Sequence, residues 1–128
     1  MSREALLAKL RVVAVERATR ARAALDGDAV EGEREAHTLK GEAQLLGRPR
    51  LASVAGALEQ LYPQVQTDVG LRGLIEEGLD LVESLAADDD AEGAEAFAAR
   101  AEAALAGGRA KALADGRADG RADGLSNG

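Results

Sequence analysis

The stretch "REAHTLKGEAQLLG" at residues 34–47 leads through a two-residue link into "RLASVAGALEQL" at residues 50–61. Apolar residues recur at helical spacing on both sides of the link, so both stretches read as helices. Gly47 is a typical helix stop, and Pro49 fits the first turn of a helix, where its missing N–H costs least. Because so short a connection favours antiparallel neighbours, the sequence predicts a helical hairpin.

Three more helices are expected around this hairpin. A first helix begins after an N-cap at Ser2 and fades at residues 26–28, and the next runs from about residue 29 to 46. The fourth begins after a cap at Thr67 or Asp68, and the fifth follows the acidic run at residues 88–90, whose carboxylates favour a helix start. The sequence therefore predicts an all-α fold, an up-and-down antiparallel four-helix bundle with a fifth C-terminal helix.

The bundle is expected to occupy residues 1–106. The inner face of the fifth helix is expected to consist of Ala91, Ala94, Phe97, Ala98, Ala101 and Leu105. Most of these side chains are small and bury little area, so we expect this helix to be the most weakly held. Beyond Gly107 and Gly108 the repeat "GRADGRADG" has almost nothing to bury. Residues 107–128 are therefore expected to form a disordered Gly/Ala/Asp/Arg-rich tail or linker.

Composition excludes several classes of function. The chain has 128 residues and no cysteine, so disulfides and thiolate metal sites are excluded. Its net charge is −7, with 10 Lys/Arg against 8 Asp/Glu in residues 1–50 and 6 against 15 in residues 51–128. An acidic chain without a basic stripe is a poor nucleic-acid binder. It shows no secretory signal and no apolar run long enough to cross a bilayer, so we expect a cytoplasmic protein with no membrane partner.

The only histidine, His37, lies in the decisive stretch. At 100° per residue it falls about 140° from the centre of the apolar stripe of its helix, so the side chain is expected to be exposed. Gly41 follows one turn later, and a mid-helix glycine costs about 1 kcal/mol relative to alanine. Close approach by another molecule would explain that cost. Lys40, at i+3, can bring its ammonium group toward an anion on the ring.

Val30 and Leu45 share the exposed half of this helix, about 20° and 80° from His37. They form either a docking patch or positions that a loop or the first helix covers, and both interpretations remain open. Glu59 lies on the flank of the following helix. If the two helices are antiparallel neighbours, its carboxylate can reach the imidazole, and a hydrogen bond to Nδ1 would leave Nε2 free as a nucleophile.

The sequence lacks the residue patterns needed for metal binding, hydrolytic catalysis or nucleotide binding. A single histidine among scattered carboxylates provides no three-ligand metal set. No serine or cysteine nucleophile stands on a glycine-rich elbow, and no Walker or Rossmann loop is present for a nucleotide. An exposed histidine without a role is the alternative, against which stand the glycine, the lysine and the flank glutamate.

The stretches "AHTLKGEAQLLG" and "RLASVAGALEQL" resemble the histidine-containing phosphotransfer (HPt) domain, and the resemblance is closest to the N-terminal domain of chemotaxis-type (CheA-like) histidine kinases. The family pattern is a histidine, a small residue, an aliphatic residue, Lys-Gly, further small residues and a glycine ten positions after the histidine. The matching positions here are His37, Thr38, Leu39, Lys40, Gly41, Ala43 and Gly47. In chemotaxis kinases the carboxylate that orients the histidine falls 22 residues later, where Glu59 stands. The resemblance covers about residues 3–106.

This resemblance implies a phosphorelay. His37 would accept a phosphoryl group at Nε2 from the catalytic domain of a histidine kinase and pass it to an aspartate of a response-regulator receiver domain. Lys40 would steady the phosphate oxygens, Gly41 would admit the partner, and Glu59 would orient the ring. ATP and Mg²⁺ would be used by the partner domains, so this domain would bind no cofactor and no metal. Docking specificity would rest on the surface residues Val30, Arg34, Gln44 and Leu45.

Two positions depart from the family. A charge stands at Glu42, where a small residue is usual, but the helical wheel puts it about 140° from His37, so little repulsion of phosphate is expected. Gly56 stands where some chemotaxis kinases carry a second histidine, which implies a simpler network around His37.

The leading hypothesis is thus an HPt module, expected to be monomeric as an isolated domain and not an enzyme on its own. Its start at Met1 and its trailing tail favour a domain of a larger CheA-like histidine kinase over a free-standing relay protein. The alternative from another class is a helical-bundle adaptor that binds partner proteins without being phosphorylated. Replacing His37 would separate the two, because a relay loses its function and an adaptor keeps it.

Overall fold

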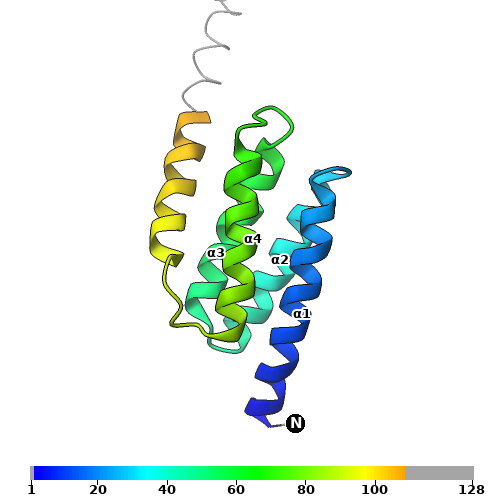
Figure 1. Ribbon diagram of the computed structural model, residues 1–128, viewed down its shortest axis with the longest axis vertical. Helices are drawn as coiled ribbons and strands as arrows, with labels where there is room; N and C mark the ends of the chain where they lie inside the picture. The colour runs from blue at the N-terminus through cyan, green and yellow to red at the C-terminus, as the bar shows by residue number, and fades with distance from the viewer. Residues whose placement is uncertain (1, 109–128) are drawn as a thin grey trace, which may run out of the picture.

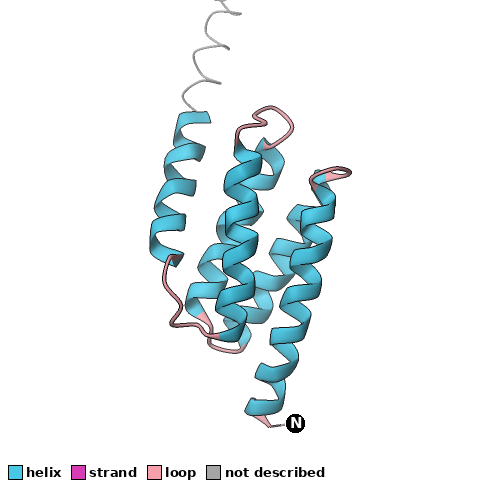
Figure 2. Cartoon of the chain, in the orientation of Figure 1, coloured by secondary structure: helices cyan, strands magenta, loops and turns pink. Residues whose placement is uncertain are grey.

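The computed structural model describes residues 2–108, and this part of the chain is helical with short connections (Figures 1 and 2). The elements are α1 (Arg3–Ala24), α2 (Ala29–Leu45), α3 (Pro49–Leu61), the 3₁₀ turn η1 (Tyr62–Gln64) and α4 (Leu71–Ala87). A further helix, here called the C-terminal helix, covers residues 94–108. No strand occurs in residues 2–108, so the all-α prediction is confirmed.

The helices α1 to α4 form a closed ring of contacts. α1 packs on α2 and α4, and α3 packs on α2 and α4, as expected for an antiparallel bundle with short loops. Figure 1 shows the C-terminal helix on the opposite side of this bundle from α1. Within residues 2–108 no helix is both long enough and apolar enough to span a membrane.

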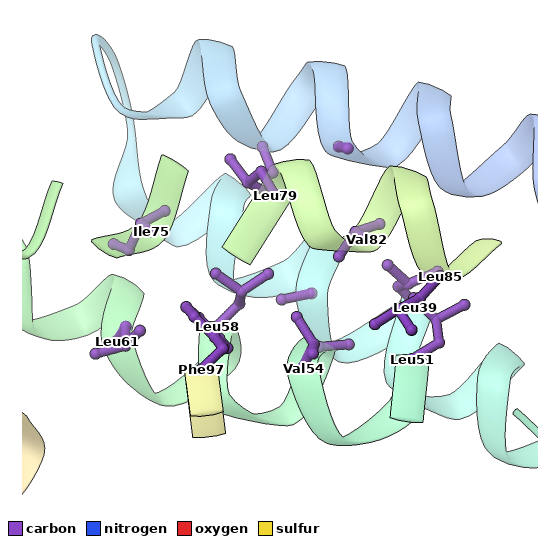
Figure 3. Packing of buried hydrophobic residues seen from close by; sticks show 14 of the residues in the cluster. Leu39, Leu51, Val54, Leu58, Leu61, Ile75, Leu79, Val82, Leu85 and Phe97 are labelled. Atoms are coloured by element: carbon purple, nitrogen blue, oxygen red, sulfur yellow. The ribbon is translucent and has the colours of Figure 1, made fainter. Parts of the chain in front are cut away.

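Leu, Val, Ile and Ala build the core together with Phe97 (Figure 3), and Tyr62 is buried as well. No charged side chain is buried in the described residues. Phe97 is fully buried and attaches the C-terminal helix, because its ring occupies the space left by the missing side chain of Gly78 on α4. Tyr62 packs its ring against Gly32 of α2 in the same way, and its hydroxyl donates a hydrogen bond to the carbonyl of Ala21 at 2.5 Å. Burial raises the pKa of this phenol.

The turn between α2 and α3 fixes how these two helices meet. Gly47 has φ of +69°, the left-handed conformation that glycine adopts without strain. The N–H groups of Gly47 and Arg48 donate to the carbonyls of Gln44 and Ala43, which is the hydrogen-bond pattern of a Schellman cap. Pro49 then starts α3. The expected hairpin is therefore present, and its two helices lie next to each other.

The end of α1 and the start of α4 differ from the predicted positions. α1 ends at Ala24 with Leu25 as its cap, before Gly27. α4 begins at Leu71 with Gly70 as its N-cap, so the predicted caps at Thr67 and Asp68 are wrong. Both side chains are used in the turn instead, since the Thr67 hydroxyl donates to the Gln64 carbonyl and the Asp68 carboxylate accepts the Gly70 N–H.

The acidic run at residues 88–90 lies in the loop ahead of the C-terminal helix and does not start it. Asp88 accepts the N–H of Asp90, and Asp89 accepts the N–H of Leu51 at the start of α3. Gly93, with φ of +111°, makes the turn into the helix at residue 94. At its other end the helix includes residues 107 and 108, which the sequence assigns to the tail. The rest of that predicted tail, residues 109–128, lies outside the described residues.

Candidate functional site

His37 stands on the outer face of α2, next to α3. Its side chain is 67% exposed, and its Nδ1 lies 2.7 Å from Oε2 of Glu59 on α3. The contact expected from the 22-residue spacing is therefore present. A neutral imidazole that donates its Nδ1–H to a carboxylate keeps a lone pair on Nε2, and Nε2 makes no hydrogen bond with any other residue in 2–108.

Glu59 divides its two oxygens between two partners. Oε2 faces His37, and Oε1 lies 2.8 Å from Nζ of Lys40. The hydrogen bond from Lys40 is the largest influence and lowers the pKa of this carboxyl group, the hydrogen bond from His37 adds to it, and partial burial opposes both. Glu59 is therefore held as an anion, the state in which it can accept the Nδ1–H.

Lys40 lies beside the ring as expected, with its ammonium group on Glu59. Its aliphatic stem crosses α3 at Gly56, where a Cβ would approach Lys40 Cδ to 3.3 Å. The glycine that departs from the chemotaxis-kinase pattern thus leaves room for the lysine stem. The network around His37 consists of one carboxylate and one ammonium group.

A hollow of about 290 Å³ opens beside the imidazole. Val30, Glu33, Arg34, His37 and Glu59 line it. Val30 is 51% exposed, so neither a loop nor α1 covers it, and its role in docking stays a prediction. The guanidinium of Arg34 pairs with Glu31 at 2.9 Å. Val30 and Arg34 are therefore brought together with the histidine, whereas sequence reasoning did not single out Glu33.

On the other side of the histidine, one and two turns along α2, the surface is open. A Cβ added at Gly41 would meet no atom within 4 Å. Gln44 is exposed, and Leu45 is 84% exposed. Leu45 is thus also uncovered, but it lines a different hollow, between α1 and α2.

Glu42 faces α1 and is neutralised there. Its carboxylate accepts two hydrogen bonds from the Arg17 guanidinium, at 2.8 and 2.9 Å, and Arg17 also donates to Glu35 at 3.1 Å. The bonds to Glu42 raise the pKa of Arg17. Glu42, which departs from the family pattern, thus forms an ion pair between α1 and α2 and not a contact with His37. The sequence alone did not reveal it, because nothing local distinguishes Arg17 from the other arginines of α1.

No group of three or more potential metal ligands occurs within residues 2–108. Around His37, a charged hydrogen-bond acceptor on Nδ1 favours one tautomer of the ring and leaves Nε2 open to solvent. The site consists of residues from α2 and α3 only.

Comparison with known proteins identifies the family of this helical chain. A search of curated proteins found no match, and a search of solved structures found none. The model of the Hpt domain family matches residues 5–120, which is most of the chain. Hpt domains are phosphotransfer modules of phosphorelays, in which they interact with kinases and receiver domains. With its histidine exposed on a helical bundle and with this match, the chain belongs to the Hpt domain family.

Proposed function

We propose that His37 is the phosphoacceptor and that its Nε2 is the atom phosphorylated. The observation that carries the proposal is the 2.7 Å contact between Nδ1 and Glu59, made by a side chain that is 67% exposed. An exposed histidine without a role has no need of a half-buried carboxylate whose pKa is kept low by a neighbouring lysine. An oriented nucleophile does need one.

The transfer needs no base beyond this arrangement. The Nε2 lone pair forms a bond to the γ-phosphorus of ATP held by a kinase domain, the bond from that phosphorus to the bridging oxygen breaks, and ADP leaves with the electron pair. The Nδ1–H stays on the ring, where Glu59 offsets the positive charge that develops. In the second step a carboxylate oxygen of a receiver aspartate attacks the same phosphorus, and the N–P electron pair returns to Nε2.

Lys40 and Gly41 serve the incoming partners. Lys40 holds Glu59 ionised and keeps an ammonium group one turn from the ring, where it can contact phosphate oxygens. Gly41 leaves the surface next to the imidazole without a side chain, so that a partner domain can approach closely. The docking residues are Val30, Arg34, Gln44 and Leu45. ATP and Mg²⁺ are used by the partners, and this module binds neither.

The partners we propose are the catalytic domain of a chemotaxis-type (CheA-like) histidine kinase and a receiver domain. His37 and Glu59 are 22 residues apart in the sequence and in contact in the structure, and Lys40 binds the same carboxylate. This arrangement supports a chemotaxis-type kinase over other proteins that contain Hpt domains. The module works as a monomer in the cytoplasm, as one domain of that kinase.

Intact-mass spectrometry after incubation with phosphoramidate tests the acceptor without the kinase. The expected result is an acid-labile gain of one phosphoryl group on the native chain and none on His37→Gln. Circular dichroism of both chains checks that each is folded. A gain that persists in His37→Gln would place phosphorylation elsewhere and overturn the assignment. A folded native chain that gains nothing from phosphoramidate or from a kinase catalytic domain would favour the adaptor.

A further inference from the structure

A second hollow lies between the N-terminal half of α1 and the C-terminal end of α2. Its volume is about 610 Å³. We call it the α1–α2 groove, and its apolar lining consists of Leu6, Leu10, Val13, Leu45 and Leu46. Leu45 is 84% exposed and Leu6 36% exposed, so the walls of the groove are open to solvent. Clustered, exposed apolar side chains of this kind mark interaction sites.

The rim of the groove is positively charged although the chain is acidic. Arg3 and Lys9 lie on it, and neither forms an ion pair with any residue in 2–108. The Arg3 guanidinium donates to the carbonyl of Leu46 at 3.1 Å, which keeps its charge at the groove. The acidic residue of the lining, Glu42, is already neutralised by Arg17. A chain with a net charge of −7 therefore presents two uncompensated cations beside this apolar surface.

The shape suits a helix. Leu6, Leu10 and Val13 recur at helical spacing on α1, so they line about two turns of one wall, and α2 forms the other wall. Two packed antiparallel helices leave between them a groove into which the side-chain ridge of a third helix fits. Figure 1 shows the first turns of α1 extending past the end of α4.

The groove is continuous with the surface around the histidine. His37, Gly41 and Leu45 follow one another at i and i+4 on α2, so they lie in one row along the helix. Gly41 leaves the middle of this row bare. A protein that covers His37 therefore meets no obstacle before Leu45, about 12 Å further along the helix.

We propose that the α1–α2 groove is a docking site for an amphipathic helix of a partner protein, with an apolar stripe that contacts the leucines and with flanking Asp or Glu residues that pair with Arg3 and Lys9. Apolar contact gives the affinity, and the rim charges select acidic helices and speed their association. A helix bound there holds its protein beside His37. Only this last consequence rests on the phosphotransfer proposed above; the docking itself does not.

The probe is a stapled helical peptide with leucine at i, i+4 and i+7 and glutamate at the flanking positions; its matched control carries lysine in place of glutamate. Amide shifts of the full chain are followed by NMR during titration. The acidic peptide is expected to shift Leu6, Lys9 and Leu45, and the basic peptide to bind at least about tenfold more weakly. Lys9→Glu should weaken the acidic peptide about tenfold, whereas Arg100→Glu, the same charge change on the C-terminal helix, should not.

Three results would overturn the proposal. The first is the absence of shifts at the groove with the acidic peptide. The second is equal binding of both peptides and no effect of Lys9→Glu. The third is a dimer of the chain alone in sedimentation that Leu6→Asp dissociates, because a second copy would then occupy the groove. Phosphoramidate labelling of the native chain and of Lys9→Glu is measured in parallel and should be equal, so a failure of His37 as the acceptor is seen separately.

Discussion

At the scale of single residues, the site depends on a carboxylate shared between an imidazole and an ammonium group. Glu59 can orient His37 only while it is ionised, and the hydrogen bond from Lys40 is the largest of the influences that lower its pKa. The lysine that the sequence suggests as a contact for phosphate thus also acts on the unphosphorylated histidine, through Glu59. Its ammonium group lies 2.8 Å from Oε1 of Glu59 in the unphosphorylated chain.

Replacing Glu59 with Gln should slow phosphorylation of His37 about tenfold or more, because a charged hydrogen bond to Nδ1 becomes a neutral one. The rate of mass gain with phosphoramidate measures this. Glu33→Gln is the matched control: Glu33 lines the same hollow but makes no hydrogen bond to the ring, so its loss should change the rate little. Equal rates for all three chains would mean that Glu59 does not orient the nucleophile.

At the scale of helices, contacts distant in sequence fix the position of α2. Local signals were enough to predict the hairpin that brings His37 to Glu59. These signals are the apolar spacing, the stop at Gly47 and the start at Pro49, and each determines backbone conformation within a few residues of itself. The contact of Gly32 with Tyr62 and that of Gly78 with Phe97 could not be predicted in this way. A buried glycine and an exposed one look alike in a sequence, and only the packed bundle shows which ring fills the space.

The same limit explains the wrong cap of α4. Thr67 and Asp68 have the residue types of an N-cap, but the Thr67 hydroxyl donates back to Gln64 of the 3₁₀ turn η1, and the Asp68 carboxylate accepts the N–H of Gly70 in the loop before α4. Likewise, the acidic run at residues 88–90 binds the start of α3 and the loop itself, which local charge rules do not include. The presence of each helix could be predicted from the periodicity of its apolar residues. Where α4 and the C-terminal helix begin depends instead on hydrogen bonds to residues outside those helices.

Two glycines of α2 should respond in opposite ways to alanine. Gly32→Ala should lower the free energy of unfolding by about 1–3 kcal/mol, because its Cβ would enter the Tyr62 ring. Gly41→Ala should raise it by up to about 1 kcal/mol, because its Cβ meets nothing and alanine favours the helix. Urea unfolding followed by circular dichroism measures both.

Gly41→Ala should also retain labelling by phosphoramidate while slowing transfer to and from protein partners, since only the latter need a bare surface there. A loss of stability in Gly41→Ala, or a gain in Gly32→Ala, would contradict the packing described for α2.

At the scale of the whole molecule, the charges stay at the surface and the core is apolar throughout residues 2–108. The bundle and the C-terminal helix share this core through Phe97, which supports one cooperative unit despite the small inward residues of that helix. That the C-terminal helix is the most weakly held remains a prediction. Ion pairs then join the helices across their outer edges: Arg17 links α1 to α2, Arg22 links α1 to α4, and Lys40 links α2 to α3.

These pairs set how stability depends on pH. Pairing with arginine or lysine lowers the pKa of Asp26, Glu35 and Glu59 in the folded chain. For Glu35 and Glu59, partial burial raises the pKa, but pairing outweighs it. A group whose folded pKa is lowered adds stability above its unfolded value, here 3.8 for Asp and 4.5 for Glu, and this stability is lost as the pH falls through the folded pKa. Repulsion from the net charge of −7 at pH 7 acts in the opposite direction, because mild acid relieves it.

The free energy of unfolding should therefore change little between pH 7 and about pH 5, where relief of repulsion acts while the pairs remain intact, and should fall steeply below pH 4.5. Urea unfolding at pH 7, 5 and 3 measures this. Glu35→Gln serves as the internal test: it should be less stable than the native chain at neutral pH and should show a shallower decline in acid, because the carboxylate that loses its partners by protonation is already absent. Stability that is unchanged at pH 3, or an acid decline equally steep in Glu35→Gln, would show that the pairs across α1 and α2 contribute little and that the apolar core alone holds the helices together.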